Sequence, residues 1–148
     1  MKIFVDTNVL LDVFQERRPH YDASVSVWDM AERGQLSGFV SVISFNNIYY
    51  LISRFHDKKH ASRAIKLLRG TFSPVPLDEQ ILNQAIDSKM DDFEDAIQFF
   101  SAVHASADFI ITRNCKDFPK SGIPVLTPEE FLAILKAQEG LNRLRRNS

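Results

Sequence analysis

The sequence predicts an α/β domain built around a mainly parallel β-sheet. Short apolar segments alternate with longer segments whose apolar residues recur at helical spacing. Two of the short segments, residues 2–5 and 108–112, have the composition of buried strands, and carboxylates follow both of them. Because parallel α/β sheets bind ligands beyond the carboxyl ends of their strands, this pattern predicts a polar site at that edge of the sheet.

Strands and helices alternate along the chain. The expected elements are, in order, a strand over 2–5, helices over 8–14 and 20–33, a strand over 39–43, a helix capped by Ser44, a basic helix over 58–69, an edge strand over 72–77, a helix capped by Asp78, an acid-headed helix over 92–106, a strand over 108–112, a brief strand over 124–126 and a helix capped by Thr127.

Local signals support several of these boundaries. Pro74 and Pro76 place the third strand at an edge, because proline cannot donate to a central ladder. Residues 127–130, Thr-Pro-Glu-Glu, combine a capping box with proline at the first helical position. In the acid-headed helix, Phe93 and His104 are expected on the apolar side. We expect one domain over residues 1–137 and a basic, fraying C-terminal tail over 138–148.

Size and composition limit the classes of protein. The 148 residues suit one domain, and 45% hydrophobic and 25% charged residues are close to averages for soluble globular proteins. The start reaches Asp6 after three apolar residues, unlike a secretory signal, so we expect a cytoplasmic protein. Polar residues interrupt the uncharged segment 34–53 too often for a membrane helix. The net charge of -1 gives no general attraction to nucleic acid.

Acidic residues give the main functional signal. Four of them fall within five positions, namely Asp91, Asp92, Glu94 and Asp95. On a helix, Asp95 points the same way as the acids three and four positions before it. Asp6 and Asp117 follow the two buried strands. If these three places meet, the repulsion between the carboxylates must be relieved by protonation or by a cation. Mg²⁺ and Mn²⁺ prefer such oxygen ligands, so a divalent-metal site is the leading hypothesis.

The same acids have a simpler interpretation. Carboxylates at a helix start cap it and complement the positive end of its dipole. However, four like charges at helical spacing repel one another and exceed what capping requires.

Other candidate sites are weaker. His56 and His60 have the spacing of a helical zinc pair, but the glutamate of the metalloprotease motif is missing and two lysines lie between them. Asn8 replaces the second acid of phosphatases that use Asp-x-Asp. Cys115 is the only cysteine, so no intrachain disulfide can form, and no base is evident beside it. The five glycines form no nucleotide-binding loop.

Four segments together resemble one known family. They are residues 4–10 (Phe-Val-Asp-Thr-Asn-Val-Leu), 94–96 (Glu-Asp-Ala), 111–118 (Ile-Thr-Arg-Asn-Cys-Lys-Asp-Phe) and 124–131 (Pro-Val-Leu-Thr-Pro-Glu-Glu-Phe). In order and spacing they resemble the PIN domain family, nucleases typified by the VapC toxins of bacterial toxin–antitoxin pairs. The resemblance covers nearly the whole chain.

The resemblance implies a fold and a function. It implies a three-layer α/β/α domain with a mainly parallel central sheet, and an endoribonuclease that uses Mg²⁺ or Mn²⁺ to hydrolyse RNA phosphodiester bonds. It also implies an antitoxin protein as partner and a homodimer. The alternative hypothesis is a noncatalytic, degenerate PIN-like module that binds RNA or protein.

Individual residues carry over by position. The first-strand Asp of the family matches Asp6 and its helix Asp matches Asp95. Its Glu on the helix after the second strand falls at Asn47, and the Asp of its Thr-Arg-Asp turn falls at Asn114. Asp117 would then supply the missing carboxylate, directly or through water, and Asp92 would offset Asn47.

The resulting predictions fall into three groups. The predicted catalytic residues are Asp6, Asp95 and Asp117, and the predicted metal ligands are Asp6, Asn47, Asp92, Asp95, Asn114 and Asp117. Thr7, Asn8 and Thr112 either orient ligands and waters or only make turn and cap hydrogen bonds. The candidate RNA-binding cations are Arg54, Arg113 and Lys116.

Overall fold

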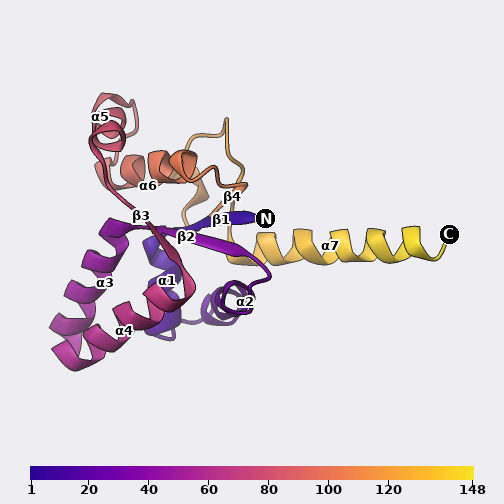
Figure 1. Ribbon diagram of the computed structural model, residues 1–148, viewed down its shortest axis with the longest axis horizontal. Coiled ribbons are helices and arrows are strands. Elements are labelled where there is room, and N and C mark those ends of the chain that lie inside the picture. Colours follow the sequence, from indigo (N-terminus) through magenta and orange to yellow (C-terminus); the bar gives the residue numbers. More distant parts are fainter.

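The computed structural model describes all residues 1–148 and contains one five-stranded, entirely parallel sheet (Figure 1). The strands are β1 (Lys2–Val5), β2 (Ser37–Ser41), β3 (Ser73–Val75), β4 (Phe109–Ile111) and β5 (Val125–Leu126). The helices are α1 (Thr7–Phe14), α2 (Tyr21–Glu32), α3 (Val42–Phe55), α4 (Lys58–Thr71), α5 (Glu79–Asp87), α6 (Phe93–His104) and α7 (Pro128–Arg146), with a 3₁₀ turn η1 (Cys115–Asp117). The predicted fold class is confirmed.

Helices cover both faces of the sheet. In β1, Ile3 and Val5 face one core, which α1, α2, α3, α4 and the start of α7 complete, whereas Phe4 faces a second core with α5 and α6. Since successive side chains of a strand point to opposite faces, a fully buried three-residue run requires a layer on each side. Figure 1 shows α5 and α6 on one side of the sheet and α1 and α4 on the other, as expected of a three-layer α/β/α domain.

The strand order fixes the place of the site. The order is β3-β2-β1-β4-β5, with β1 paired to β2 on one side and to β4 on the other. The chain therefore adds β2 and β3 on one side of β1, and then β4 and β5 on the other side. The crevice beyond the carboxyl ends of β1 and β4 is the topological switch point, where open α/β sheets bind ligands. β3 lies at an edge, as its prolines predicted.

Two helix caps were predicted correctly and a third was misplaced. Asp78 caps α5, and Thr127 forms a capping box with Glu130 at the start of α7. In contrast, α3 begins at Val42, because the hydroxyl of Ser41 accepts a hydrogen bond from the Ile43 amide at 3.3 Å. Ser44, the predicted cap, lies inside α3 and is fully buried.

The predicted apolar side of α6 was wrong in part. Phe93 is 50% exposed and His104 is exposed, whereas Gln98 and Ser101 are fully buried. The helix turns a polar side chain inward because Gln98 has hydrogen-bonding partners there, described below.

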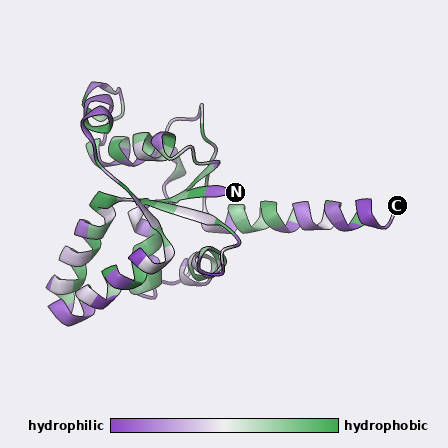
Figure 2. Cartoon of the chain, viewed as in Figure 1, coloured by the Kyte–Doolittle hydropathy of each residue, from purple (hydrophilic) through white to green (hydrophobic).

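The C-terminal segment is helical. α7 continues to Arg146 and so includes most of the residues predicted to fray, although every residue from 136 onward is exposed. Figure 2 shows that the outer part of this helix is mostly hydrophilic. The boundary of the domain at residue 137 stays a prediction. None of the helices combines the length and the apolar character needed to cross a membrane.

Candidate active site

A cleft of about 430 Å³ opens at the carboxyl ends of β1 and β4. Eight of the predicted site residues line it, namely Asp6, Thr7, Asn8, Asn47, Asp92, Asp95, Asn114 and Asp117. They come from the end of β1, from α3, from the start of α6 and from the turn after β4. Acids that lie far apart in the sequence therefore share one cleft.

Asp6 is the most buried of these acids, with 7% of its surface exposed. Its Oδ1 accepts a hydrogen bond from the Thr7 amide at 2.8 Å, and its Oδ2 accepts one from the Thr112 hydroxyl at 2.7 Å. Burial raises the pKa of Asp6, and the hydrogen bonds from Thr112 and Thr7 offset part of the rise. Both carboxylate oxygens are thus held in fixed directions.

The Thr112 hydroxyl donates its proton to Asp6. Its oxygen accepts hydrogen bonds from Asn8 Nδ2 at 3.4 Å and from the Asn114 amide at 3.2 Å, so its proton is left for Asp6. The Asn8 Oδ1 also accepts a hydrogen bond from the Arg113 amide at 3.3 Å. These contacts tie the turn after β4 to the start of α1.

Asp95 has a strongly raised pKa. Burial and, to a lesser extent, the nearby carboxylates of Asp92, Asp6, Asp117 and Glu94 together raise the pKa of Asp95 to about 7. The Asp92 side chain caps α6 by accepting a hydrogen bond from the Asp95 amide at 2.9 Å. No lysine or arginine forms an ion pair with any of these acids. Among the influences on the pKa of Asp6, burial is the largest, and the attraction of Arg113, which lowers this pKa, is the smallest. The negative charge in the cleft is therefore largely uncompensated.

Glu94 also lines the cleft, although the sequence analysis did not place it among the metal ligands. Its Oε1 accepts a hydrogen bond from Asn47 Nδ2 at 2.8 Å. Burial and the Asp92 carboxylate raise the pKa of Glu94, and the bond from Asn47 lowers it. One signal in the sequence could have identified Glu94. Position 47 has an amide where the family has a glutamate, and an amide can donate a hydrogen bond to a carboxylate on a facing helix.

A buried polar network lies behind the cleft. Gln98 Nε2 donates to the Thr7 hydroxyl at 3.1 Å and to the Ser44 hydroxyl at 3.3 Å, and the two hydroxyls are 2.7 Å apart. All three residues are buried, so the bonds are shielded from water. They join α1, α3 and α6, the helices next to Asp6, Asn47 and Asp95. The network fixes the spacing of the acids.

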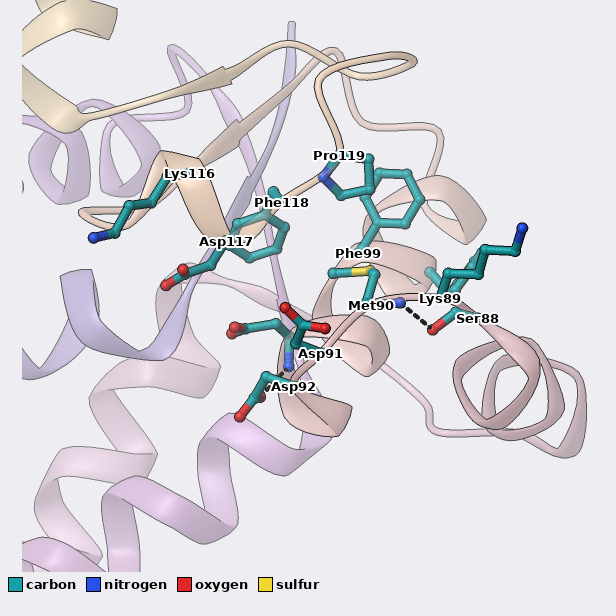
Figure 3. A pocket seen from close by; sticks show the side chains of 12 residues that line it. Ser88, Lys89, Met90, Asp91, Asp92, Phe99, Lys116, Asp117, Phe118 and Pro119 are labelled. Atoms are coloured by element: carbon teal, nitrogen blue, oxygen red, sulfur yellow. Dashed lines mark hydrogen bonds between the residues drawn. The ribbon is translucent and has the colours of Figure 1, made fainter.

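The predicted RNA-binding cations do not gather at the cleft. Arg113 Nε lies 2.7 Å from Oδ2 of the fully buried Asp12, a charge contact that is not aligned as a hydrogen bond. Burial raises the pKa of Asp12, and Arg113 lowers it. Arg54 is exposed in the last turn of α3 and does not line the cleft. Lys116 borders a neighbouring cavity (Figure 3).

The donor set suits a hard divalent cation. It consists of carboxylate and amide oxygens, without histidine or cysteine, which disfavours zinc. No three acidic, histidine or cysteine side chains converge closely enough to chelate an ion directly. Mg²⁺ is held by one or two carboxylates and keeps several of its waters, so a cleft ringed by acids at a wider spacing fits it.

A comparison with family models identifies the chain. The model of the PIN domain matches residues 2–116. The protein belongs to the PIN domain family. Its sequence is 32% identical over 135 residues to Ribonuclease VapC1 of Aquifex aeolicus (strain VF5), a match that covers 88% of this chain and 92% of that protein.

Solved structures have the same fold. A chain of a toxin–antitoxin complex from Klebsiella pneumoniae superposes with a TM-score of 0.64 at 25% identity, covering 85% of this chain and 97% of that one. A chain of VapBC2 from Rickettsia felis, bound to a DNA fragment from their promoter, has a TM-score of 0.66 at 13% identity with the same coverage, a likeness of fold alone. The resemblance inferred from the sequence is thus confirmed.

Proposed function

We propose that this PIN-domain protein is a VapC-like endoribonuclease that depends on a divalent metal ion, Mg²⁺ or Mn²⁺. The observation that carries the proposal is the meeting of Asp6, Asp95 and Asp117 on one cleft without a compensating cation. The relative named as a ribonuclease and the PIN domain match support RNA as the substrate.

Asp6, Asp95 and Asp117 would hold the metal, one or two of them directly and the rest through its bound waters, with Asp92 and Glu94 beside them. The amide oxygens of Asn47 and Asn114 are the remaining donors. A bound divalent ion polarises a phosphate and lowers the pKa of its water, which is the chemistry that phosphodiester hydrolysis requires.

The protein's own groups prepare the site for the ion. Thr112 and the Thr7 amide hold the two oxygens of Asp6 in fixed directions. Asp95, with a pKa of about 7, carries a proton for part of the time at neutral pH. Because a carboxylate binds metal in its deprotonated form, Asp95 must release this proton, and metal affinity should rise as the pH increases through 7.

Cleavage of a mixed RNA pool in MnCl₂ tests the proposal. Wild-type protein should cleave, and Asp6→Asn and Asp95→Asn should not. Asp87→Asn is the matched control, since Asp87 is exposed at the end of α5, outside the cleft. The proposal fails if the wild type cleaves no RNA and calorimetry detects no binding of Mg²⁺ or Mn²⁺.

The alternative function, a noncatalytic RNA- or protein-binding module, is motivated by Asn47 and Asn114. Under it, RNA binding would survive both EDTA and Asp95→Asn. The contact between Asn47 and Glu94 weighs against this alternative, because it brings a carboxylate to the position that lacks one.

An antitoxin protein is the partner we propose, since the similar solved structures include toxin–antitoxin complexes. Co-expression with the product of a small adjacent gene should yield a complex that suppresses cleavage. We also propose a homodimer, which the mass of the purified protein in solution would test.

A further inference from the structure

A second cavity of about 570 Å³ lies beside the cleft and shares Asp92, Asp95 and Asp117 with it. The segment between α5 and α6, the first turns of α6 and the segment after η1 form its walls. Its apolar part consists of Met90, Phe99, Phe100, Phe118 and Pro119. Figure 3 shows Met90, Phe99, Phe118 and Pro119 grouped together, with Asp91, Asp92 and Asp117 beside them; Asp92 and Asp117 also line the cleft.

The apolar wall is held in place. The rings of Phe99 and Phe100 pack edge to face with centroids 5.2 Å apart. The Met90 amide donates to the Ser88 hydroxyl at 3.4 Å, and this hydroxyl donates to the Ala85 carbonyl at 2.9 Å, at the end of α5. Met90, Phe99 and Phe100 also pack against the second core. A fixed wall binds a planar ligand with little loss of conformational entropy.

Two cations lie at the cavity without a partner. Lys89 and Lys116 line it, are exposed and form no ion pair. Figure 3 shows them on opposite sides of the apolar group. The cavity thus combines an apolar wall, free cations and direct continuity with a candidate phosphate-cleaving cleft. A nucleotide has matching parts, because its base has an apolar face and its phosphates are anionic.

We propose that this cavity binds a nucleobase next to the phosphate that is cleaved, with Lys116 beside a neighbouring phosphate. This inference rests on the proposed ribonuclease function and assigns part of its substrate site. The base packs on Phe99 and Met90. Because such contacts tolerate all four bases, the cavity should bind any of them.

Methyl groups of methionine allow a test that requires no cleavage. The chain has three methionines, Met1, Met30 and Met90, and only Met90 lines the cavity. In protein labelled with ¹³C at the methionine methyl groups, titration with adenosine and with uridine should shift the Met90 signal saturably. Met30, which packs on the first core, is the internal control. Nucleosides carry no charge, so the surrounding acids do not repel them.

Two variants separate the roles of the wall and of the cations. Phe99→Leu should weaken nucleoside binding about tenfold, because the aromatic face is lost. Lys116→Met should leave adenosine binding unchanged but weaken binding of adenosine 5′-monophosphate in MgCl₂. Lys136→Met on α7 is the matched control.

The outcomes distinguish this inference from the proposed function. If the wild type cleaves RNA while the Met90 signal ignores every nucleoside, the base site is refuted and the ribonuclease stands. If Met90 shifts but the wild type cleaves no RNA and binds neither Mg²⁺ nor Mn²⁺, the ribonuclease and the placement of the base beside a cleaved phosphate are both refuted, and only nucleoside binding by the cavity stands. Equal shifts of all three methionines would mean nonspecific binding and would also refute the base site.

A different feature, the projecting half of α7, carries a second inference. α7 extends away from the domain (Figure 1), and Leu141 and Leu144 are 58% and 69% exposed. Helical spacing places Ile134, Ala137, Leu141 and Leu144 on one face, a different face from that of Phe131, which is buried in the first core. An isolated helical segment is only marginally stable in water, because most helical stability in proteins comes from packing of the apolar face. The exposed apolar face of α7 therefore requires a partner.

Charge and side-chain size indicate what the partner is. α7 begins with Glu129 and Glu130 and ends with Arg143, Arg145 and Arg146. A second α7 running antiparallel places acids opposite bases, whereas a parallel one places bases opposite bases. With the two helices crossing at Ala137, Leu141 faces Ala133 of the second copy, so a large residue meets a small one. We infer that two copies of this chain pair through antiparallel α7 helices.

Cysteine cross-linking tests both the pairing and its direction. In a Cys115→Ser background, Ala137→Cys should form a disulfide-linked dimer under mild oxidation, because residue 137 meets its own copy. Leu144→Cys should not, since the two copies of this position lie at opposite ends. Cross-linking of Leu144→Cys in place of Ala137→Cys would refute the antiparallel arrangement.

Sedimentation provides a readout that needs no cysteine. The wild type should be dimeric and Leu141→Glu monomeric, with Leu67→Glu, at an exposed position of α4, as the matched control. A monomeric wild type, or a dimer that Leu141→Glu leaves intact, would refute the inference.

Discussion

Replacing Asp95 with asparagine should stabilise the metal-free protein, by an amount that depends on pH. The folded protein raises the pKa of this carboxyl from 3.8 to about 7. Between these values the native state keeps a proton that the unfolded chain has lost, so stability falls as the pH rises and levels off above 7. Three pKa units correspond to about 4 kcal/mol at most. Because Asp95 is only half-buried, solvent screening reduces this to about 2 kcal/mol.

Urea unfolding in EDTA, followed by circular dichroism, measures the effect. The free energy of unfolding of Asp95→Asn minus that of the wild type should grow by about 2 kcal/mol between pH 4 and pH 8. Asp87→Asn should track the wild type, since Asp87 lies outside the cleft. Added MgCl₂ at pH 8 should stabilise the wild type and leave Asp95→Asn nearly unchanged. If the free energies of unfolding of Asp95→Asn and the wild type differed by the same amount at every pH, burial and the neighbouring carboxylates would not destabilise the charged form of Asp95.

Three further substitutions test other contacts. Glu94→Gln should weaken Mn²⁺ binding by calorimetry, and adding Asn47→Glu should restore it; no recovery would mean that the two positions are not equivalent. Thr112→Val should weaken Mn²⁺ binding about 10- to 100-fold, because the hydroxyl orients a ligand, whereas Thr112→Ser should not. Gly38→Ala should cost about 1–3 kcal/mol in urea unfolding, because the added Cβ would lie 2.5 Å from the Phe72 ring; unchanged stability would show that the ring moves aside freely.

The sequence was sufficient to predict the edge of the sheet at which the acids gather. The run Ile3-Phe4-Val5 has no polar interruption, so it had to be covered on both faces and therefore central. Asp6 directly follows it, and a carboxylate after a central parallel strand lies at the ligand-binding edge. Thr112 was predicted only to orient ligands or waters or to make turn hydrogen bonds, and in the structure its hydroxyl donates a 2.7 Å hydrogen bond to Asp6.

Contacts across the fold could not be predicted in the same way. Ser41 and Ser44 are both good caps, and only the end of β2 decides between them. Asp12 looks like an exposed position of a short helix, so its burial against Arg113 was not foreseen. Consequently Arg113, predicted to bind RNA, turns toward a buried acid. Periodicity also separates Glu94 from Asp95, because adjacent helical residues point about 100° apart.

The contact between Asn47 and Glu94 bears on whether the chain can still be a nuclease. Asn47 carries no negative charge at the position on α3 where the family has a glutamate, but its amide donates a hydrogen bond at 2.8 Å to the Glu94 carboxylate on α6. That bond favours the charged form of Glu94 and fixes its direction. The cleft therefore has five carboxylates although position 47 carries none: Asp6, Asp92, Glu94, Asp95 and Asp117. We accordingly expect metal affinity to depend on Glu94 in this chain.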